Sequence, residues 1–243
     1  MIDTTTLIEL LRKMGHDMRV PLNTVISTGD MLLAGAYDPL TPKQLKAVDR
    51  LQRNNHRLLA VLDDFVTYVK ADAGQLEVHA QPFDPRAQLP LWCDSIRKSA
   101  EQKGLNFQIT VADDVPASIN ADESTIKRII QALLWNAVGF TTAGSIHVNA
   151  EWTSTKAWMI TIKDTGCGVP PEEVAHIFEP FWRGSQRPQM PTANAGLGLA
   201  VAQVLSKLMG GSVTLKESNS SGSIFCLTIP IQSVKSSTST NPA

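Results

Sequence analysis

Several features that would indicate other classes of protein are scarce or missing in this sequence. The net charge is only −1, with 22 basic against 23 acidic residues, and there is neither a basic stripe nor a basic amphipathic helix. This balance argues against nucleic-acid binding and against docking on a membrane surface. No apolar run approaches the ~18 residues of a membrane helix, and no signal peptide is recognisable. We therefore expect a cytoplasmic, soluble piece that meets a membrane only through segments absent from this chain.

Cysteine is also rare. Cys93, Cys167 and Cys226 are scattered and odd in number, which argues against a disulfide framework and a cysteine-based zinc site and indicates a reducing compartment. Apolar residues, in contrast, make up 43% of the chain, enough to bury a core. The last stretch, residues 233–243, is rich in Ser and Thr and is predicted to be a linker or tail.

Residues 1–72 predict a domain of two long helices. Apolar side chains recur in both at spacings of mostly three and four, the pattern of heptad-like stripes. The stripes are Leu7, Leu11, Met14, Met18, Leu22, Val25 and Leu32, then Val48, Leu51, Asn55, Leu58, Leu62, Phe65 and Val69. Between the helices, Thr41 suits an N-cap and Pro42 suits the first helical position. Because two such helices cannot close a core alone, we expect a homodimer that forms a four-helix bundle.

Residues 73–232 change to a mixture of strands and helices and predict a second domain. A turn is expected at 82–85, and the Gly- and Pro-rich stretch 165–192 has no long periodic run. The expected strands are 75–79, 105–111, 145–151, 157–163, 212–216 and 223–229, and the expected helices are 86–102, 122–140 and 196–209. This order predicts an α/β sandwich with helices on one face of a mainly antiparallel sheet. The predicted fold class is therefore α+β.

The first expected helix carries a candidate nucleophile, His16. It lies two residues from both Met14 and Met18, about 200° around a helix, so its ring should point away from the apolar stripe and into solvent. A neutral imidazole has one unprotonated nitrogen and is a usable nucleophile. The adjacent Asp17 could orient the ring and assist proton removal.

Other residues near His16 suit phosphate chemistry without being specific for it. Arg12 and Arg19 lie one turn either side, where either could stabilise an incoming phosphate. Pro21 predicts a local bend just past the histidine. A surface histidine on a bundle helix is common, so taken alone His16 would have no catalytic role.

Two later polar residues suit a nucleotide and its metal. Asn136 lies late in the helix expected over 122–140, and an amide oxygen there is a hard ligand suited to Mg²⁺. Asp164 follows a strand and could accept a hydrogen bond from an exocyclic amine, while Gly166 and Gly168 would let the backbone approach a flat ring. Taken singly, these features also fit an ordinary helix end and an Asp-x-Gly turn.

Two further motifs complete the series. Phe178 and Phe181 bracket a proline and suit the anchor of a lid, or a hydrophobic plug that holds a long loop. Gly196 and Gly198, with Leu197 between them, open a helix whose exposed N–H groups and dipole suit phosphates. A lone Gly-x-Gly also occurs where helices pack tightly.

The run His-Asp-x-Arg-x-Pro-Leu at residues 16–22 resembles the phosphoacceptor box of sensor histidine kinases. The later motifs, in this order and separation, resemble the Asn box, first glycine box, Phe box and second glycine box of the ATP-binding domain of the same family. That domain belongs to the superfamily of the gyrase, heat-shock-chaperone and mismatch-repair ATPases. The resemblance covers residues 5–231, nearly the whole chain.

The resemblance implies a role for each motif. His16 would take the γ-phosphoryl group with Asp17 as its acid/base partner, and Asn136 would ligate Mg²⁺ on ATP. Asp164 would bind the adenine amino group. The other nucleotide-binding positions implied are Gly166, Gly168, Phe178, Phe181, Gly196, Leu197 and Gly198. The family also implies a homodimer and phosphotransfer to an Asp of a response-regulator receiver domain.

Three positions depart from the family pattern. Ala132 replaces an Asn one turn before the metal ligand, and Gly139 replaces a basic residue that often follows it, so we expect weak ATP affinity or a slow kinase. Val20 replaces a polar residue that positions water, so we expect poor phosphatase activity. The alternatives to an active autokinase are a degenerate kinase that acts as a dimerising regulatory module, and an ATPase of the wider superfamily.

Overall fold

The computed structural model describes residues 4–185 and 195–231. The side chains of Leu7 and Arg12 and the expected tail 233–243 lie outside this description. The described residues form two compact units. The first contains residues 4–76, 177–183 and 195–201, and the second contains residues 77–176, 184–185 and 202–231. This grouping places the Phe-box segment with the helical hairpin, whereas the sequence pattern assigned it to the second domain; the domain boundaries remain a prediction.

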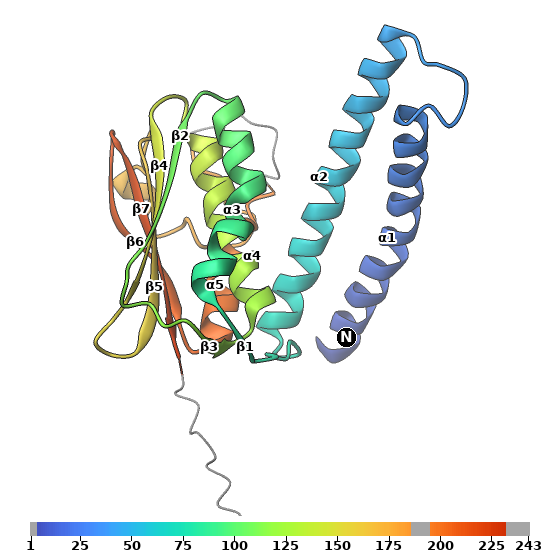
Figure 1. The fold of residues 1–243 in the computed structure, drawn as a ribbon. Coiled ribbons are helices and arrows are strands. Elements are labelled where there is room, and N and C mark those ends of the chain that lie inside the picture. The colour runs from blue at the N-terminus through green and yellow to red at the C-terminus, as the bar shows by residue number, and fades with distance from the viewer. Residues whose placement is uncertain (1–3, 186–194, 232–243) are drawn as a thin grey trace, which may run out of the picture. The chain divides into compact units, whose positions relative to one another are not determined.

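The predicted helical hairpin is confirmed. Helix α1 (Thr4–Leu33) and helix α2 (Pro42–Asp72) run antiparallel in the first unit (Figure 1). Thr41 caps α2 as expected, because its hydroxyl accepts the Gln44 N–H while the Gln44 side chain accepts the Thr41 N–H at 2.8 Å. These reciprocal bonds satisfy two backbone donors that would otherwise lack partners, and they define where α2 begins.

The two helices approach closely at glycines rather than along the whole expected apolar stripe. A Cβ on Gly15 would collide with Val66, and a Cβ on Gly29 would collide with Gln52. Gly15 and Gly29 are two heptads apart, as are Val66 and Gln52, so both contacts belong to one antiparallel register. Gln52 strengthens the second contact, because its Nε2 donates to the Ile26 carbonyl at 2.7 Å and to the Asp30 carboxylate at 2.6 Å.

The expected stripe of α1 is therefore divided between two faces. Met14, Met18 and Val25 are exposed, while Leu11 and Leu22 are half-buried. The sequence predicts that the stripe packs in a bundle of two copies but does not say which of its members face α2. The glycine contacts decide that, because they set which side of α1 meets α2. The exposed members form a second apolar face along α1.

The sandwich in the second unit has the predicted architecture. Its helices are α3 (Pro85–Gln102), α4 (Glu123–Phe140) and α5 (Gly198–Leu208), the last shared with the first unit, and a short 3₁₀ turn spans Pro171–Glu173. Its strands are β1 (Gln81–Phe83), β2 (Asn106–Val111), β3 (Ile119–Ala121), β4 (Ser145–Trp152), β5 (Ala157–Asp164), β6 (Ser212–Asn219) and β7 (Gly222–Pro230). The main sheet has the order β2-β4-β5-β7-β6, with only the β2–β4 pair parallel. Helices α3, α4 and α5 lie on one side of that sheet (Figure 1).

The core lies between this sheet and its helices. Strands β4 and β5 alternate buried and half-exposed side chains, which is why both were recognisable in the sequence. Phe83 of β1, Trp92 of α3 and Trp158 of β5 form an aromatic cluster with ring centroids 5.8 to 6.3 Å apart.

The chain between the hairpin and α3 differs from the expectation. Residues 75–79 form no strand, and the expected turn at 82–85 contains most of β1 followed by the start of α3. β1 pairs with β3, which was not expected at all. Both strands have only three residues and pair across a long stretch of sequence, so neither has a local pattern that would reveal it.

Candidate functional site

His16 presents its ring to solvent in the first unit. Its side chain is 76% exposed, as its spacing from Met14 and Met18 predicted. Its Nδ1 lies 3.3 Å from the Asp17 carboxylate. With the Nδ1 proton held by that carboxylate, Nε2 carries the lone pair and points away from it. The expected orienting contact is therefore present.

The same turn is fastened to α2 through Arg19, about 60° around the helix from His16. The Nε and Nη2 atoms of Arg19 each lie 2.7 Å from Asp63 Oδ1, and this ion pair is partly buried. The position of Arg19 one turn from His16 suits a contact with incoming phosphate, but its guanidinium binds Asp63. Because Asp63 is 44 positions away in the sequence, no local pattern could have identified it.

Asp164 ends strand β5 in the second unit and is almost fully buried. Its Oδ1 accepts the Gly166 N–H at 2.8 Å. Burial raises the pKa of this carboxyl, and hydrogen bonds from the backbone of Gly166 and Ser223 oppose the rise. A buried carboxylate at a strand end can accept from the amine of a flat heterocycle.

The glycines after Asp164 are required by close backbone contacts. A Cβ on Gly166 would lie 2.6 Å from the Phe140 carbonyl oxygen, so the last turn of α4 packs against this loop. Gly168 has a φ of 72°, and a Cβ there would collide with the carbonyl of Asn219, the last residue of β6. The structure thus brings the expected first glycine box against the helix of the Asn box.

Asn136 lies one turn before Phe140 on α4 and is half-buried. The helix is fastened at both ends. Asp122 caps its start, and Lys103 donates from Nζ to the Val138 carbonyl at 2.7 Å near its end. Both contacts hold in place the helix that carries Asn136.

The Phe-box and second-glycine-box residues described in the first unit contact one another. Phe181 has a φ of 65°, which is rare for a bulky residue, and its N–H donates to the Gly196 carbonyl at 2.8 Å. Gly196 has a φ of 73°, and a Cβ there would collide with the Trp182 carbonyl. The Phe181 ring is exposed and lies 6.2 Å from that of Phe65, whereas Phe178 is half-buried.

Gly198 differs from Gly196 in its surroundings. It begins α5, and a Cβ there would meet no atom of the described residues within 4 Å. Leu197 beside it is buried and holds the start of the helix in place. Packing therefore does not explain the glycine, whereas the approach of a phosphate to the N–H groups of a helix N-terminus would.

Glu173 is a further residue that the sequence did not reveal. Its carboxylate accepts the Ser185 N–H at 2.9 Å, and hydrogen bonds from Ser185 lower its pKa. The bond joins two residues of the Gly- and Pro-rich stretch 165–192 that are 12 positions apart. Among residues 4–185 and 195–231, no three His, Cys, Asp or Glu side chains gather as a metal-binding group, and no helix is both long and apolar enough to span a bilayer.

Comparisons with known proteins match two family models along the chain. The phospho-acceptor domain model His Kinase A matches residues 6–74, and the model for the histidine kinase-, DNA gyrase B- and HSP90-like ATPases matches residues 121–233. The chain belongs to the sensor histidine kinases. His16 lies within the first matched region, and Asn136, Asp164 and both glycine boxes lie within the second.

Named relatives belong to the same family. The chain is 30% identical over 224 residues to the Escherichia coli sensor protein TorS and 31% identical over 221 residues to the histidine-protein kinase BarA. It spans only 24% of the length of each, although these matches cover 91% and 89% of this chain. Full-length ShkA, crystallised with AMPPNP, is 30% identical with a TM-score of 0.78 over 93% of this chain and 46% of that one. Acinetobacter baumannii AdeS, at 22% identity and a TM-score of 0.63, supports the fold alone over 90% of this chain and 98% of that one.

Proposed function

We propose that this histidine kinase chain transfers the γ-phosphoryl group of ATP to His16 and then to an aspartate of a response-regulator receiver domain. The observation that carries the proposal is the exposed His16 ring, oriented through Nδ1 by Asp17, in a chain that also holds the ATPase-family fold. A nucleophile needs access and a defined free nitrogen, and His16 has both.

The first chemical step needs only His16, Asp17 and the nucleotide. The Nε2 lone pair attacks the γ-phosphorus, the bond to the β–γ bridging oxygen breaks, and ADP leaves. The ring then carries a positive charge. Asp17 would either stabilise this charge through its hydrogen bond to Nδ1 or remove it by taking the Nδ1 proton. Such transfers have loose transition states, so positioning and charge neutralisation supply most of the catalysis.

The nucleotide would be held by residues whose surroundings fit its parts. The buried Asp164 carboxylate would accept the adenine amino group, and the open N-terminus of α5 at Gly198 would donate N–H groups to phosphate. Asn136 fits an oxygen ligand to Mg²⁺, with phosphate oxygens and water as the other ligands. When bound, Mg²⁺ would neutralise charge that develops on the leaving phosphates. Because His16 is in the other unit, residues 71–74 would act as a hinge between the two.

The active form would be a cytoplasmic homodimer. Met14, Met18 and Val25 of α1 and Leu51 and Leu58 of α2 are apolar and exposed in the single chain. A second copy that covered them would complete a four-helix bundle. The receiver domain would then approach the exposed His16 ring from outside.

A dimerising regulatory module with little kinase activity is the second candidate. Ala132 and Gly139 favour it, because each removes a polar group expected near the phosphates, and Gly139 is buried. The complete His16–Asp17 pair and the buried Asp164 favour the active kinase.

Labelling with radioactive Mg-ATP tests the proposal, with His16→Ala as the variant and Lys13→Ala as a surface control on the same helix. We expect acid-labile label on the parent and the control, and none on His16→Ala. Label that survives in His16→Ala would contradict the proposal. No label on a dimeric parent would support the regulatory module, and free phosphate without labelled protein would support the ATPase.

A further inference from the structure

The turn of α1 that carries His16 is anchored to α2 at two points. Gly15, on one side of His16, is buried and fits against Val66 so closely that any side chain would collide. Arg19, three residues after His16, reaches Asp63 with two nitrogens, each 2.7 Å from the same carboxylate oxygen. Val66 and Asp63 are neighbours on one face of α2.

These anchors determine the rotation of α1 about its own axis. Gly15 and Arg19 are four residues apart and lie on the same face of the helix, within about 40° of each other. His16 follows Gly15 by about 100° around the axis, so its ring leaves the seam and faces solvent. A change in the rotation would carry the imidazole with it.

The helix is weakened in this same turn. Pro21 has no N–H, so the bond that residue 21 would donate to the Asp17 carbonyl is missing from α1. The Gly15 contact is apolar and small, and it resists rotation less than a directed bond does. The Arg19–Asp63 ion pair lies between these two weak points. Two nitrogens of Arg19 converge on one oxygen of Asp63, which makes the contact directional.

We propose that Asp63 is a positioning residue for His16 and that it acts through Arg19. The ion pair fixes the rotation of α1 so that Nε2 of His16 is presented for in-line attack. The inference rests on the proposed function, and it assigns Arg19 a role between the helices rather than on the phosphate.

A charge exchange tests this assignment in the full chain. We expect Asp63→Asn and Arg19→Ala each to slow autophosphorylation at saturating nucleotide by about tenfold to a hundredfold, the scale of small misplacements of reacting groups. The KM for nucleotide should not change, because Asn136 and Asp164 lie in the other unit. The double variant Arg19→Asp/Asp63→Arg rebuilds the pair in reverse and should recover most of the rate.

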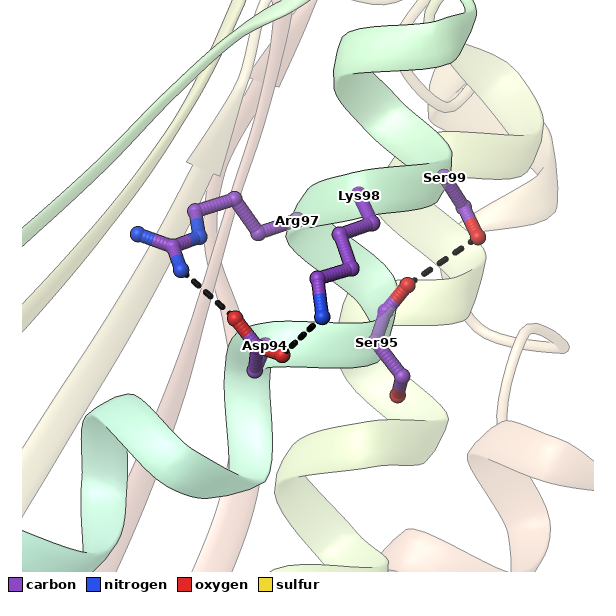
Figure 2. A network of polar contacts seen from close by, with 5 residues as sticks. All are labelled: Asp94, Ser95, Arg97, Lys98 and Ser99. Atoms are coloured by element: carbon purple, nitrogen blue, oxygen red, sulfur yellow. Dashed lines mark hydrogen bonds and ion pairs between the residues drawn. The ribbon is translucent and has the colours of Figure 1, made fainter.

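An ion pair elsewhere provides the matched control. On α3, Asp94 binds Arg97 at 2.6 Å and Lys98 at 2.7 Å (Figure 2). These contacts lie within one helix of the second unit, so Asp94→Asn removes ion pairs without affecting the hairpin. We expect Asp94→Asn to leave the autophosphorylation rate, the KM for nucleotide and the hydrogen exchange of the hairpin unchanged.

Hydrogen exchange separates failure of this inference from failure of the proposed function, because it needs no kinase activity. The backbone amides of residues 16–20 and 22 should exchange faster in Asp63→Asn and return to the parent rate in the charge-exchange variant. Unchanged exchange in Asp63→Asn would overturn the inference. So would a folded charge-exchange variant that stays as slow as Arg19→Ala, since Arg19 would then be needed for its own contact with phosphate.

Discussion

Asp164 carries the clearest electrostatic sign of a binding residue. Burial removes water from its carboxylate and raises its pKa, while the backbone N–H groups of Gly166 and Ser223 oppose the rise without cancelling it. A raised carboxyl pKa means that the fold favours the protonated form. The ionised form therefore costs stability at neutral pH, and this cost disappears as the pH falls through the folded-state pKa. A partner that donates a hydrogen bond to Asp164 would offset the cost, which is how a nucleotide would gain affinity here.

Gly196 and Gly198 should respond differently to the same substitution. Gly196→Ala places a Cβ against the Trp182 carbonyl at a positive φ, so the local structure must distort. Gly198→Ala meets no atom in the part of the chain that the structure describes and adds a better helix former, so it should stabilise the chain by up to about 1 kcal/mol.

If Gly198 serves a phosphate, Gly198→Ala should nevertheless weaken nucleotide binding by about tenfold. Thermal unfolding of both variants, with and without an ATP analogue, provides the measurement. A Gly198→Ala protein that bound nucleotide as tightly as the parent would remove this site from the proposal.

At the scale of secondary structure, the stability of α4 depends on the contacts of its N-cap residue, Asp122. Asp122 is buried, and its carboxylate accepts from the N–H of Thr125 at 2.9 Å and of His79 at 3.0 Å, and from the Ser124 hydroxyl at 2.8 Å. Burial alone would raise its pKa, but the hydrogen bonds outweigh burial and lower it. The cap joins the start of α4 to the segment that precedes β1, and it steadies the helix that carries Asn136.

Asp122→Ala should lower the free energy of unfolding by about 2 kcal/mol at neutral pH, the upper range for a lost N-cap. A lowered pKa makes this contribution fully present above the unfolded-state value near 3.9. It is lost as the pH falls through the folded-state pKa, so the gap between parent and variant should narrow in acid. Urea unfolding across that range checks the sign, and the exposed Asp113→Ala is the control with no expected change.

At the scale of the whole molecule, the exposed apolar face of the hairpin is the strongest reason to expect a dimer. Leu51 and Leu58 are 60% and 48% exposed and lie one heptad apart on α2. Leu91 on α3 is 67% exposed but stands alone on its helix. Single exposed apolar residues are ordinary, whereas a row at heptad spacing needs a partner.

Leu58→Glu should therefore dissociate the dimer, and Leu91→Glu should not. Leu58 is already about half buried in the single chain, so each copy loses about 1 kcal/mol of burial and the dimer about 2 kcal/mol. The dimer affinity should therefore fall about 30-fold, and further because the Glu charge would be buried. Sedimentation equilibrium measures the shift, and circular dichroism verifies that the helices remain. A Leu58→Glu protein that stayed dimeric at the parent's affinity would place the partner on another surface.

The helices and the central strands were predictable because their signals are local. Capping at Thr41, the periodicity of both hairpin helices and the alternation in β4 and β5 each depend on residues close in sequence. β1 and β3 were not predictable, because each is three residues long and is stabilised only by the other. The motif positions from His16 to Gly198 were also recognisable, since they are short patterns in a characteristic order.

The amino-acid sequence by itself determined the family, the helices and the five strands of the main sheet, and the chemical groups available to the site. Only the tertiary structure decided which face of α1 meets α2, that Arg19 is engaged by Asp63, and that Gly196 is enclosed while Gly198 is open. The physical reason is that a periodic pattern states which residues share a helical face but not what that face contacts. Contacts between distant residues depend on how closely two elements approach, and the glycines of α1 determine that distance here.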